Sequence, residues 1–219
     1  MLARATVVAI LLTLFAPIPA TAQQVSPVEI SAGYLGLSAG NDGYPKGYYV
    51  DFVANVNARL GIVVATDGAY RSESFEHLVL GGRRVQGEGT VILERLPVTL
   101  KTTTRGVVAG GRFTWPDPRV RYFVQASVGA AHLSSRADIN SPSASAASLR
   151  DAYHLSRWRA AIQAGSGANV AISSRIGARV GVDYRRLERV PMGFAEDENR
   201  GHGQNQLIFT LGVSWMVGK

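Results

Sequence analysis

The sequence predicts an all-β fold, namely an eight-stranded antiparallel up-and-down barrel that crosses a membrane with its strands. Three observations predict it. Eight segments alternate between apolar and polar residues, the connections between them alternate between short and long, and aromatic residues gather at both ends of the segments.

The eight predicted strands are separated by clusters of Gly, Pro, Asn and Asp. They cover residues 28–37, 47–57, 60–70, 102–113, 121–133, 157–168, 176–186 and 204–216. The connections at 57–59, 115–119 and 169–175 are short, and the other four are longer. In an up-and-down sheet this places short periplasmic turns at one end and long extracellular loops at the other. Segment 71–100 has some strand character, which would extend the barrel above the membrane.

Alternation by itself does not say which side of each strand faces water. In the second predicted strand, Val50 and Phe52 alternate with Asp51 and Asn55. A soluble barrel or sandwich would bury the apolar set, whereas a membrane barrel would turn it outward to lipid and place the polar set inside.

Three features favour the membrane barrel. The polar set is rich in Gly, and residues this small fit a crowded interior. The cations of the polar set within the strands are Arg rather than Lys, and a planar guanidinium group is well suited to ion pairs in a confined space. Aromatic rings at both strand ends match two membrane interfaces. The predicted interface aromatics are Tyr48, Tyr70, Trp115, Tyr122, Trp158, Tyr184 and Trp215.

The same parity predicts a polar network inside the barrel. Eight strands enclose an interior just wide enough to be filled by side chains, and charges packed there must pair or be solvated. We expect three aspartates to pair with arginines, without specifying the partners. The predicted lumen residues are Asp51, Asp67, Arg112, Arg121, Arg159, Arg179, Asp183 and Arg185.

The N-terminal residues predict export. Arg4 precedes an apolar run from Val7 to Ala16, and Ala20-Thr21-Ala22 is a small-x-small cleavage site. We therefore expect a signal peptide over residues 1–22 and one barrel domain over residues 23–219. Removing residues 1–22 leaves a net charge of about +6, and with export predicted, anionic lipid headgroups fit this charge better than nucleic acid. The sequence contains no cysteine, so a disulfide framework is excluded.

The strand segments also resemble a known family. The stretches "GYYVDFVANVNARLGIVVATDGAY", "GARVGVDYRRLE" and "NQLIFTLGVSW" are similar to the small outer-membrane β-barrels related to opacity-type surface proteins and to the transmembrane domain of outer membrane protein A. The resemblance covers nearly all of the predicted mature chain. It implies an eight-stranded barrel in the outer membrane of a diderm bacterium with surface-exposed loops. Such barrels usually end on an aromatic residue, whereas Trp215 lies four residues before the end.

Catalytic, cofactor-binding and metal-binding residues are not predicted. His132-Leu133-Ser134 has the His-x-Ser spacing of lipid A deacylases from related barrels, but Ser135 replaces their Asn and no Glu follows within fourteen residues. The acidic stretch around His202 is interpreted as a solvated charged loop.

We predict a monomeric structural or surface protein rather than an enzyme. Its partners would be outer-membrane lipids and lipopolysaccharide, with host or cell-surface molecules reached through the loops and minor porin-like permeability as a weaker hypothesis. The alternatives are a secreted lipocalin-like binding barrel and, less favoured, a lipid A-modifying outer-membrane enzyme.

Overall fold

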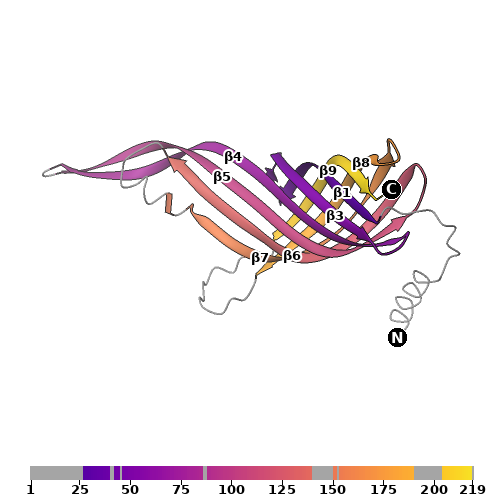
Figure 1. Cartoon of the computed structure of the whole chain (residues 1–219). Helices are drawn as coiled ribbons and strands as arrows, with labels where there is room; N and C mark the ends of the chain where they lie inside the picture. The colour runs from indigo at the N-terminus through magenta and orange to yellow at the C-terminus, as the bar shows by residue number, and fades with distance from the viewer. Residues whose placement is uncertain are drawn as a thin grey trace, which may run out of the picture.

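The computed structural model describes residues 27–39, 42–44, 46–85, 88–139, 150–151, 153–189 and 204–218. These residues form nine strands and no long helix (Figure 1). No helix in the described residues is long and apolar enough to cross a membrane. The strands are β1 (Val28–Ala39), β2 (Asp42–Tyr44), β3 (Lys46–Asn55), β4 (Leu60–Val85), β5 (Glu88–Trp115), β6 (Val120–Ile139), β7 (Leu155–Ala171), β8 (Ile176–Arg189) and β9 (Gln204–Val217).

Eight of the nine strands close into an antiparallel barrel, which confirms the predicted fold class. β1 and β3 to β9 each pair with the next strand of this set, and β1 also pairs with β9 from Val28↔Val217 to Ala39↔Gln206. Closure matters because hydrocarbon offers no partner to an unpaired backbone N–H or C=O group. The short strand β2 was not predicted. It pairs with the loop end of β1, on the edge that β3 occupies nearer the turn end.

The three short turns share one local hydrogen-bond motif. Asn57, Asp117 and Ser173 each begin the turn with a side-chain oxygen that accepts from the backbone N–H groups two and three residues later. The distances are 2.8 Å for both bonds of Asn57, 2.8 and 3.0 Å for Asp117, and 3.3 and 3.1 Å for Ser173. Side chains that satisfy turn N–H groups allow a tight reversal. We call this end of the barrel the turn end and the opposite end the loop end.

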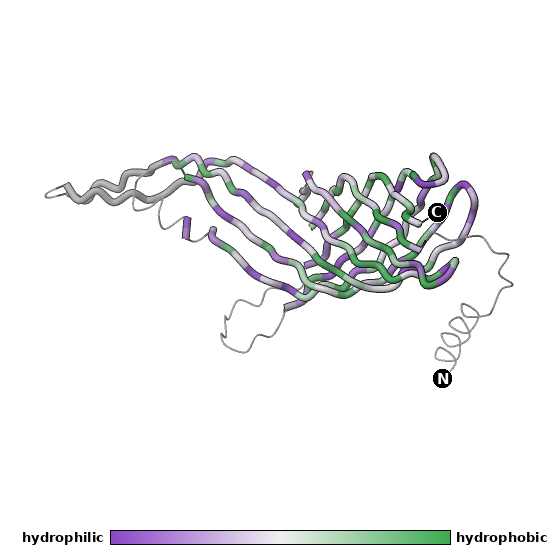
Figure 2. The backbone as a smooth tube through the Cα atoms, in the orientation of Figure 1, coloured by the Kyte–Doolittle hydropathy of each residue, from purple (hydrophilic) through white to green (hydrophobic). Residues whose placement is uncertain are grey.

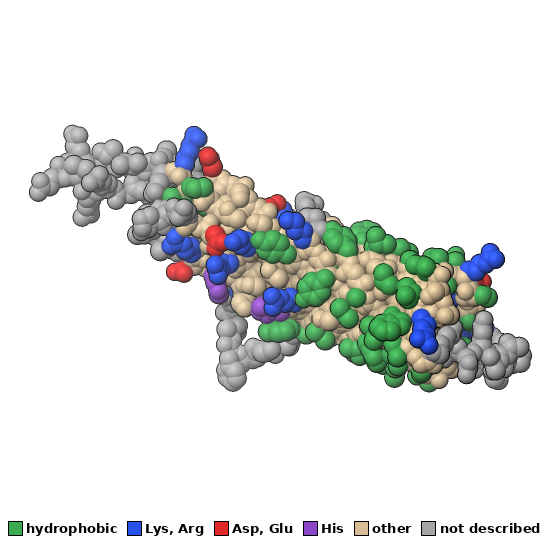
Figure 3. All heavy atoms as spheres, turned by 45° about the horizontal axis from the view of Figure 1, so that its top comes forward, with side chains coloured by type: hydrophobic (Ala, Val, Ile, Leu, Met, Phe, Trp, Pro, Cys, Tyr) green, Lys and Arg blue, Asp and Glu red, His purple; other side chains and the backbone are tan. Residues whose placement is uncertain are grey.

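The barrel is inverted relative to a soluble protein. Phe52 and Leu211 point outward with 44% and 59% of their surface exposed, whereas Arg179 and Asp183 point inward with 2% and 5% exposed. Figure 3 shows hydrophobic side chains covering the visible barrel wall. Exposing this much apolar surface to water would be unfavourable, so the outer surface is suited to an apolar environment.

Three strands continue well beyond the rim of the barrel. β4 and β5 remain paired from Leu60↔Phe113 to Val85↔Glu88, and β6 follows β5 as far as Val98↔Ile139. We call residues 71–85, 88–102 and 135–139 the extension. Figures 1 and 2 show it projecting beyond the loop end of the barrel, away from the labelled chain termini. The strand character predicted for residues 71–100 is confirmed over the described residues, because 71–85 and 88–102 pair with each other as a hairpin.

The long connection predicted after the strand 121–133 also begins later than expected. Residues 134–139 belong to β6, because β5 continues alongside them and supplies backbone partners. Residues 140–149 of that predicted loop, most of the loop 187–203 including His202, and the predicted signal peptide lie outside the described residues.

Candidate functional site

The polar centre of the barrel interior is organised around Glu29 of β1. Its Oε2 accepts from Arg121 Nη2 at 3.0 Å, and its Oε1 accepts from Asn169 Nδ2 at 2.8 Å. Arg112 and Arg179 also lie within 3.5 and 3.7 Å of Oε1. Four strands thus converge on one buried carboxylate, and this convergence offsets the cost of burying its charge.

Asp51 of β3 completes this centre. Its Oδ2 lies 3.1 Å from Arg112 Nη2 and 2.5 Å from Arg179 Nη2. The two guanidinium groups also contact the Phe123 ring, with their Cζ atoms 4.5 and 4.4 Å from its centroid. A ring face attracts a cation and shields it from water. We call Glu29, Asp51, Arg112, Arg121 and Arg179 the lumen network.

A second ion pair lies further toward the loop end. Arg185 of β8 donates to both carboxylate oxygens of Asp67 on β4, and its Nε donates to Gln163 Oε1 at 2.9 Å. The position opposite is Gly106, where an added Cβ would lie 2.7 Å from Asp67 Oδ1 and 2.8 Å from Arg185 Nη1. Glycine here leaves the space that the ion pair fills.

Two predicted lumen residues do not pair as expected. Asp183 contacts an amide, because Gln125 Nε2 donates to its Oδ1 at 2.8 Å, and no described guanidinium lies within ion-pair distance. Arg159 lies at the loop end of β7, cross-strand from Ala131, and its buried Nη1 has no hydrogen-bond partner among the described residues. Alternation along a strand predicts which side a residue faces, but it does not predict which residues of other strands lie next to it.

Glu29, a member of the lumen network, and Asn169, which donates to it, were not among the predicted lumen residues. A usable signal existed for Glu29, since it alternates with Ser31 and Gly33 on the polar side of the first strand. Leu35 and Leu37 continue the same side as apolar residues and hide the pattern. Asn169 lies at the start of a predicted turn, where Asn has another common explanation.

Apolar side chains fill the interior at the loop end, which was not predicted. They form two buried clusters. We call them the apolar plug; its members are Leu35, Leu37, Ala39, Tyr44, Tyr49, Ala69 and Ile208 in one cluster and Ala65, Val108, Ala131, Ala161 and Leu187 in the other. The interior is therefore charged and polar near the turn end, whereas near the loop end the apolar plug surrounds the single Asp67–Arg185 ion pair among the described residues.

The predicted interface aromatics all lie on the outer surface. Trp115 and Tyr122 are cross-strand partners next to the β5–β6 turn, and Trp215 lies near the end of β9. Tyr48, Tyr70, Trp158 and Tyr184 lie toward the loop end, each at least 36% exposed. Tyr48 covers the backbone of Gly68, its cross-strand partner, where an added Cβ would meet the ring at 2.7 Å.

His132 lies on the outer wall rather than in the lumen. Its Nε2 is 3.0 Å from Ser156 Oγ, and its ring lies 5.0 Å from the Trp158 ring. Ser134, the residue of the His-x-Ser spacing, is the cross-strand partner of Ser156. In the described contacts the imidazole has a hydroxyl neighbour but no carboxylate to orient it, as a nucleophile–base pair requires.

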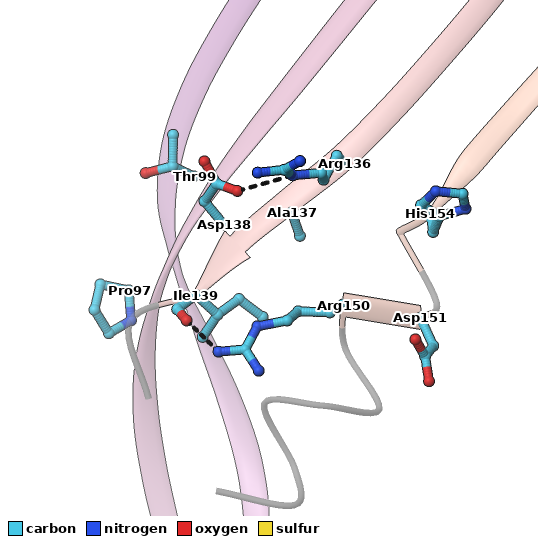
Figure 4. A pocket seen from close by; sticks show the side chains of 9 residues that line it. All are labelled: Pro97, Thr99, Arg136, Ala137, Asp138, Ile139, Arg150, Asp151 and His154. Carbon is cyan, nitrogen blue, oxygen red and sulfur yellow. Dashed lines mark hydrogen bonds and ion pairs between the residues drawn. The ribbon is translucent and has the colours of Figure 1, made fainter. Parts of the chain in front are cut away.

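The extension has an apolar inner face and a polar outer face. Leu96, Val98, Ala137 and Ile139 are buried together, and Tyr153 packs against them. Figure 4 shows a pocket at its base, where Arg136 Nε donates to Asp138 Oδ1 and Arg150 Nη2 donates to the Ile139 carbonyl.

Asp138 also accepts from Lys101 Nζ at 2.5 Å across the outer face. Donation from Lys101, followed by donation from Arg136, lowers the pKa of the Asp138 carboxyl below its usual value. The same contact raises the pKa of Lys101. The charges of this exposed face are thus held in local pairs.

Several solved barrel structures are similar to this chain over most of its length, at low sequence identity. No protein-family model and no curated protein matches the sequence. One similar solved structure is that of Ail, the attachment invasion locus protein of Yersinia pestis, in complex with the heparin analogue sucrose octasulfate. Its sequence is 14% identical, the match covers 86% of this chain and 95% of that chain, and the TM-score is 0.48. Neisserial surface protein A is 11% identical, with 86% and 95% covered and a TM-score of 0.47. The N-terminal β-barrel domain of Pseudomonas aeruginosa OprF is 13% identical, with 87% and 97% covered and a TM-score of 0.45.

Proposed function

We propose that this chain is an integral β-barrel of the bacterial outer membrane, exported by a signal peptide over residues 1–22. The observation that supports this most is the inversion of the barrel: a closed wall with an apolar outer surface, aromatic residues near both ends of that surface, and buried ion pairs inside. A secreted lipocalin-like carrier would instead bury residues such as Phe52 and Phe209 around a cavity, and here they are 44% and 48% exposed.

Membrane fractionation with a heat-modifiability gel tests this proposal. We expect the protein in the outer-membrane fraction and expect the unboiled sample to migrate differently from the boiled one, because the closed barrel resists unfolding by detergent. A protein that stays in solution without detergent and migrates identically in both samples would contradict the proposal.

The proposed role is structural and non-catalytic, with contacts to other surfaces made by the extension and the loops. β4 pairs with β3 only up to Tyr70 and with β5 up to Val85, so residues 76–85 have a described strand on one side alone. An unpaired strand edge is a template for main-chain contacts with another chain. The filled lumen makes solute passage the weaker hypothesis, and we expect no discrete conductance in planar bilayers.

Shortening the extension tests the surface role. Glu73 and Leu100 are cross-strand partners, so residues 74–99 can be replaced by Asn-Gly without changing the register of the barrel. We expect this variant to keep its gel shift but to lose attachment of expressing cells to a host-cell layer. Removing residues 83–90 is the matched control, because it shortens the hairpin at its tip alone. Undiminished attachment by the longer deletion would argue against the surface role.

A further inference from the structure

The outer wall carries cations at its loop end that lack an acidic partner. Arg105 of β5 and Lys46 of β3 are exposed, and no carboxylate among the described residues pairs with either. Other exposed cations nearby do have one: Lys101 and Arg136 pair with Asp138, and Arg186 pairs with Glu188. Arg105 and Lys46 therefore differ from the neighbouring cations because their positive charges have no carboxylate partner among the described residues.

The position of Arg105 makes an unpaired charge costly. Along β5, the next outward residue toward the turn end is Val107, which is 54% exposed on the apolar wall, and the next toward the loop end is Thr103. Arg105 thus lies at the border between the apolar wall and the polar extension. A guanidinium at the edge of hydrocarbon is stabilised when its long stem reaches a headgroup, and a phosphate accepts its two N–H groups together.

Aromatic and polar groups surround this cation on the same outer surface. His132 is the cross-strand partner of Arg105 on β6, and Trp158 is in turn the partner of His132 on β7. On the other side, Arg105 pairs with Gly68, which Tyr48 covers. Such rings lie at the level of lipid headgroups in membrane proteins. The row therefore places a free guanidinium between aromatic side chains that favour the interface.

Lys46 extends the surface across two strands. It is the cross-strand partner of Tyr70, and Tyr70 is the partner of Thr103, two residues from Arg105. Neighbouring strands are about 4.8 Å apart, so the backbones of β3 and β5 are about 10 Å apart at this level. Two cations at this spacing can contact separate phosphates of one large headgroup.

We propose that Lys46 and Arg105, framed by Tyr48, Tyr70, His132 and Trp158, form a binding surface for the phosphates of an outer-leaflet lipid of the lipid A class. This inference rests on the proposed function, since it needs the barrel to be embedded with its loop end outward. Phosphate oxygens would accept from the guanidinium and the ammonium, while the acyl chains lie along the apolar wall beside Val107.

A single-tryptophan reporter tests the proposal. Substituting Trp115→Phe and Trp215→Phe leaves Trp158 as the reporter beside the surface, and the protein is reconstituted into phosphatidylcholine vesicles with increasing lipid A. We expect a saturable change in Trp158 emission with lipid A, and none when inorganic phosphate is added instead. A change produced equally by inorganic phosphate would indicate a simple anion site and overturn the lipid assignment.

Charge-matched variants locate the surface. K46Q/R105Q is expected to weaken the apparent affinity for lipid A by at least about tenfold, which corresponds to about 1.4 kcal/mol. The control K101Q/R136Q removes two cations that already pair with Asp138 and should leave the affinity unchanged. Equal affinities for both double variants, or equal loss in both, would overturn the proposal.

The gel shift separates this inference from the proposed function. A reporter protein that inserts into vesicles and shows the heat-dependent shift, yet does not respond to lipid A, contradicts the lipid surface alone. A protein that neither inserts nor shifts contradicts the outer-membrane barrel itself.

Discussion

The two halves of the barrel interior exclude water by different physical means. Near the turn end, the lumen network joins charges from five strands, and each contact depends on a particular partner at a particular distance. Near the loop end, the apolar plug fills its space by volume. A buried charge without its partner is very unfavourable, whereas a shortened apolar side chain leaves a cavity that its neighbours can partly fill. The turn half should therefore tolerate substitution less well than the loop half.

The largest expected effect is in the turn half. Arg179→Leu removes a guanidinium that lies near both Glu29 and Asp51 and contacts the Phe123 ring. We expect the free energy of unfolding to fall by about 4 kcal/mol, because two buried carboxylates then share fewer cations. Urea unfolding of the protein in lipid vesicles measures this. Arg186→Leu is the matched control, since its partner Glu188 is exposed and such pairs contribute little.

Truncation in the apolar plug should cost somewhat less. Leu187→Ala removes a fully buried side chain of the loop half and is expected to lower the free energy of unfolding by about 3 kcal/mol. Leu187→Met, which nearly conserves volume, should cost less than about 1.5 kcal/mol. If Leu187→Ala proved more damaging than Arg179→Leu under the same conditions, the proposed difference between the halves would be wrong.

A smaller effect is expected where glycine makes room for a polar group. At Gly165, an added Cβ would lie 2.0 Å from Asp183 Oδ1, so the carboxylate must move and strain its contact with Gln125. We expect Gly165→Ala to cost about 2 kcal/mol in the same assay. Gly111→Ala is a suitable control, because nothing lies within 4 Å of its added Cβ. Similar losses in both variants would show that crowding of Asp183 is not the cause, since chain entropy alone would make a Gly→Ala substitution stabilising.

The smallest effect concerns pH and lies outside the barrel interior. The backbone N–H groups of Val120 and Arg119 lower the pKa of the Asp117 carboxyl in the β5–β6 turn. A carboxyl whose pKa is lower in the folded state stabilises the fold above its unfolded pKa, and this contribution is lost as pH falls through the folded value. We expect unfolding of the wild type to become slightly easier below about pH 4. Asp117→Asn keeps a turn acceptor and should reduce that dependence, whereas an unchanged pH profile would exclude Asp117 as its source.

Much of the fold could be predicted because alternation has a period of two. Asp51 had to face the side opposite Phe52, and the Gly-rich, Arg-containing side indicated which one was inside. The extension was harder to predict, since its residues pair locally and the sequence does not say where the membrane ends. The inward position of Glu29 was not predicted, because the apolar residues Leu35 and Leu37 lie on the same side of β1 and hide the polar pattern.

The sequence by itself determined the number of barrel strands, the three short turns and the side of each barrel strand that faces inward, because these depend on neighbours a few residues apart. Tertiary structure alone decided that Asp51 meets Arg112 and Arg179, that Asp183 meets Gln125, and that Arg105 and Lys46 share one outer surface. The physical reason is that such meetings depend on the stagger between strands around a closed barrel, which no single strand contains.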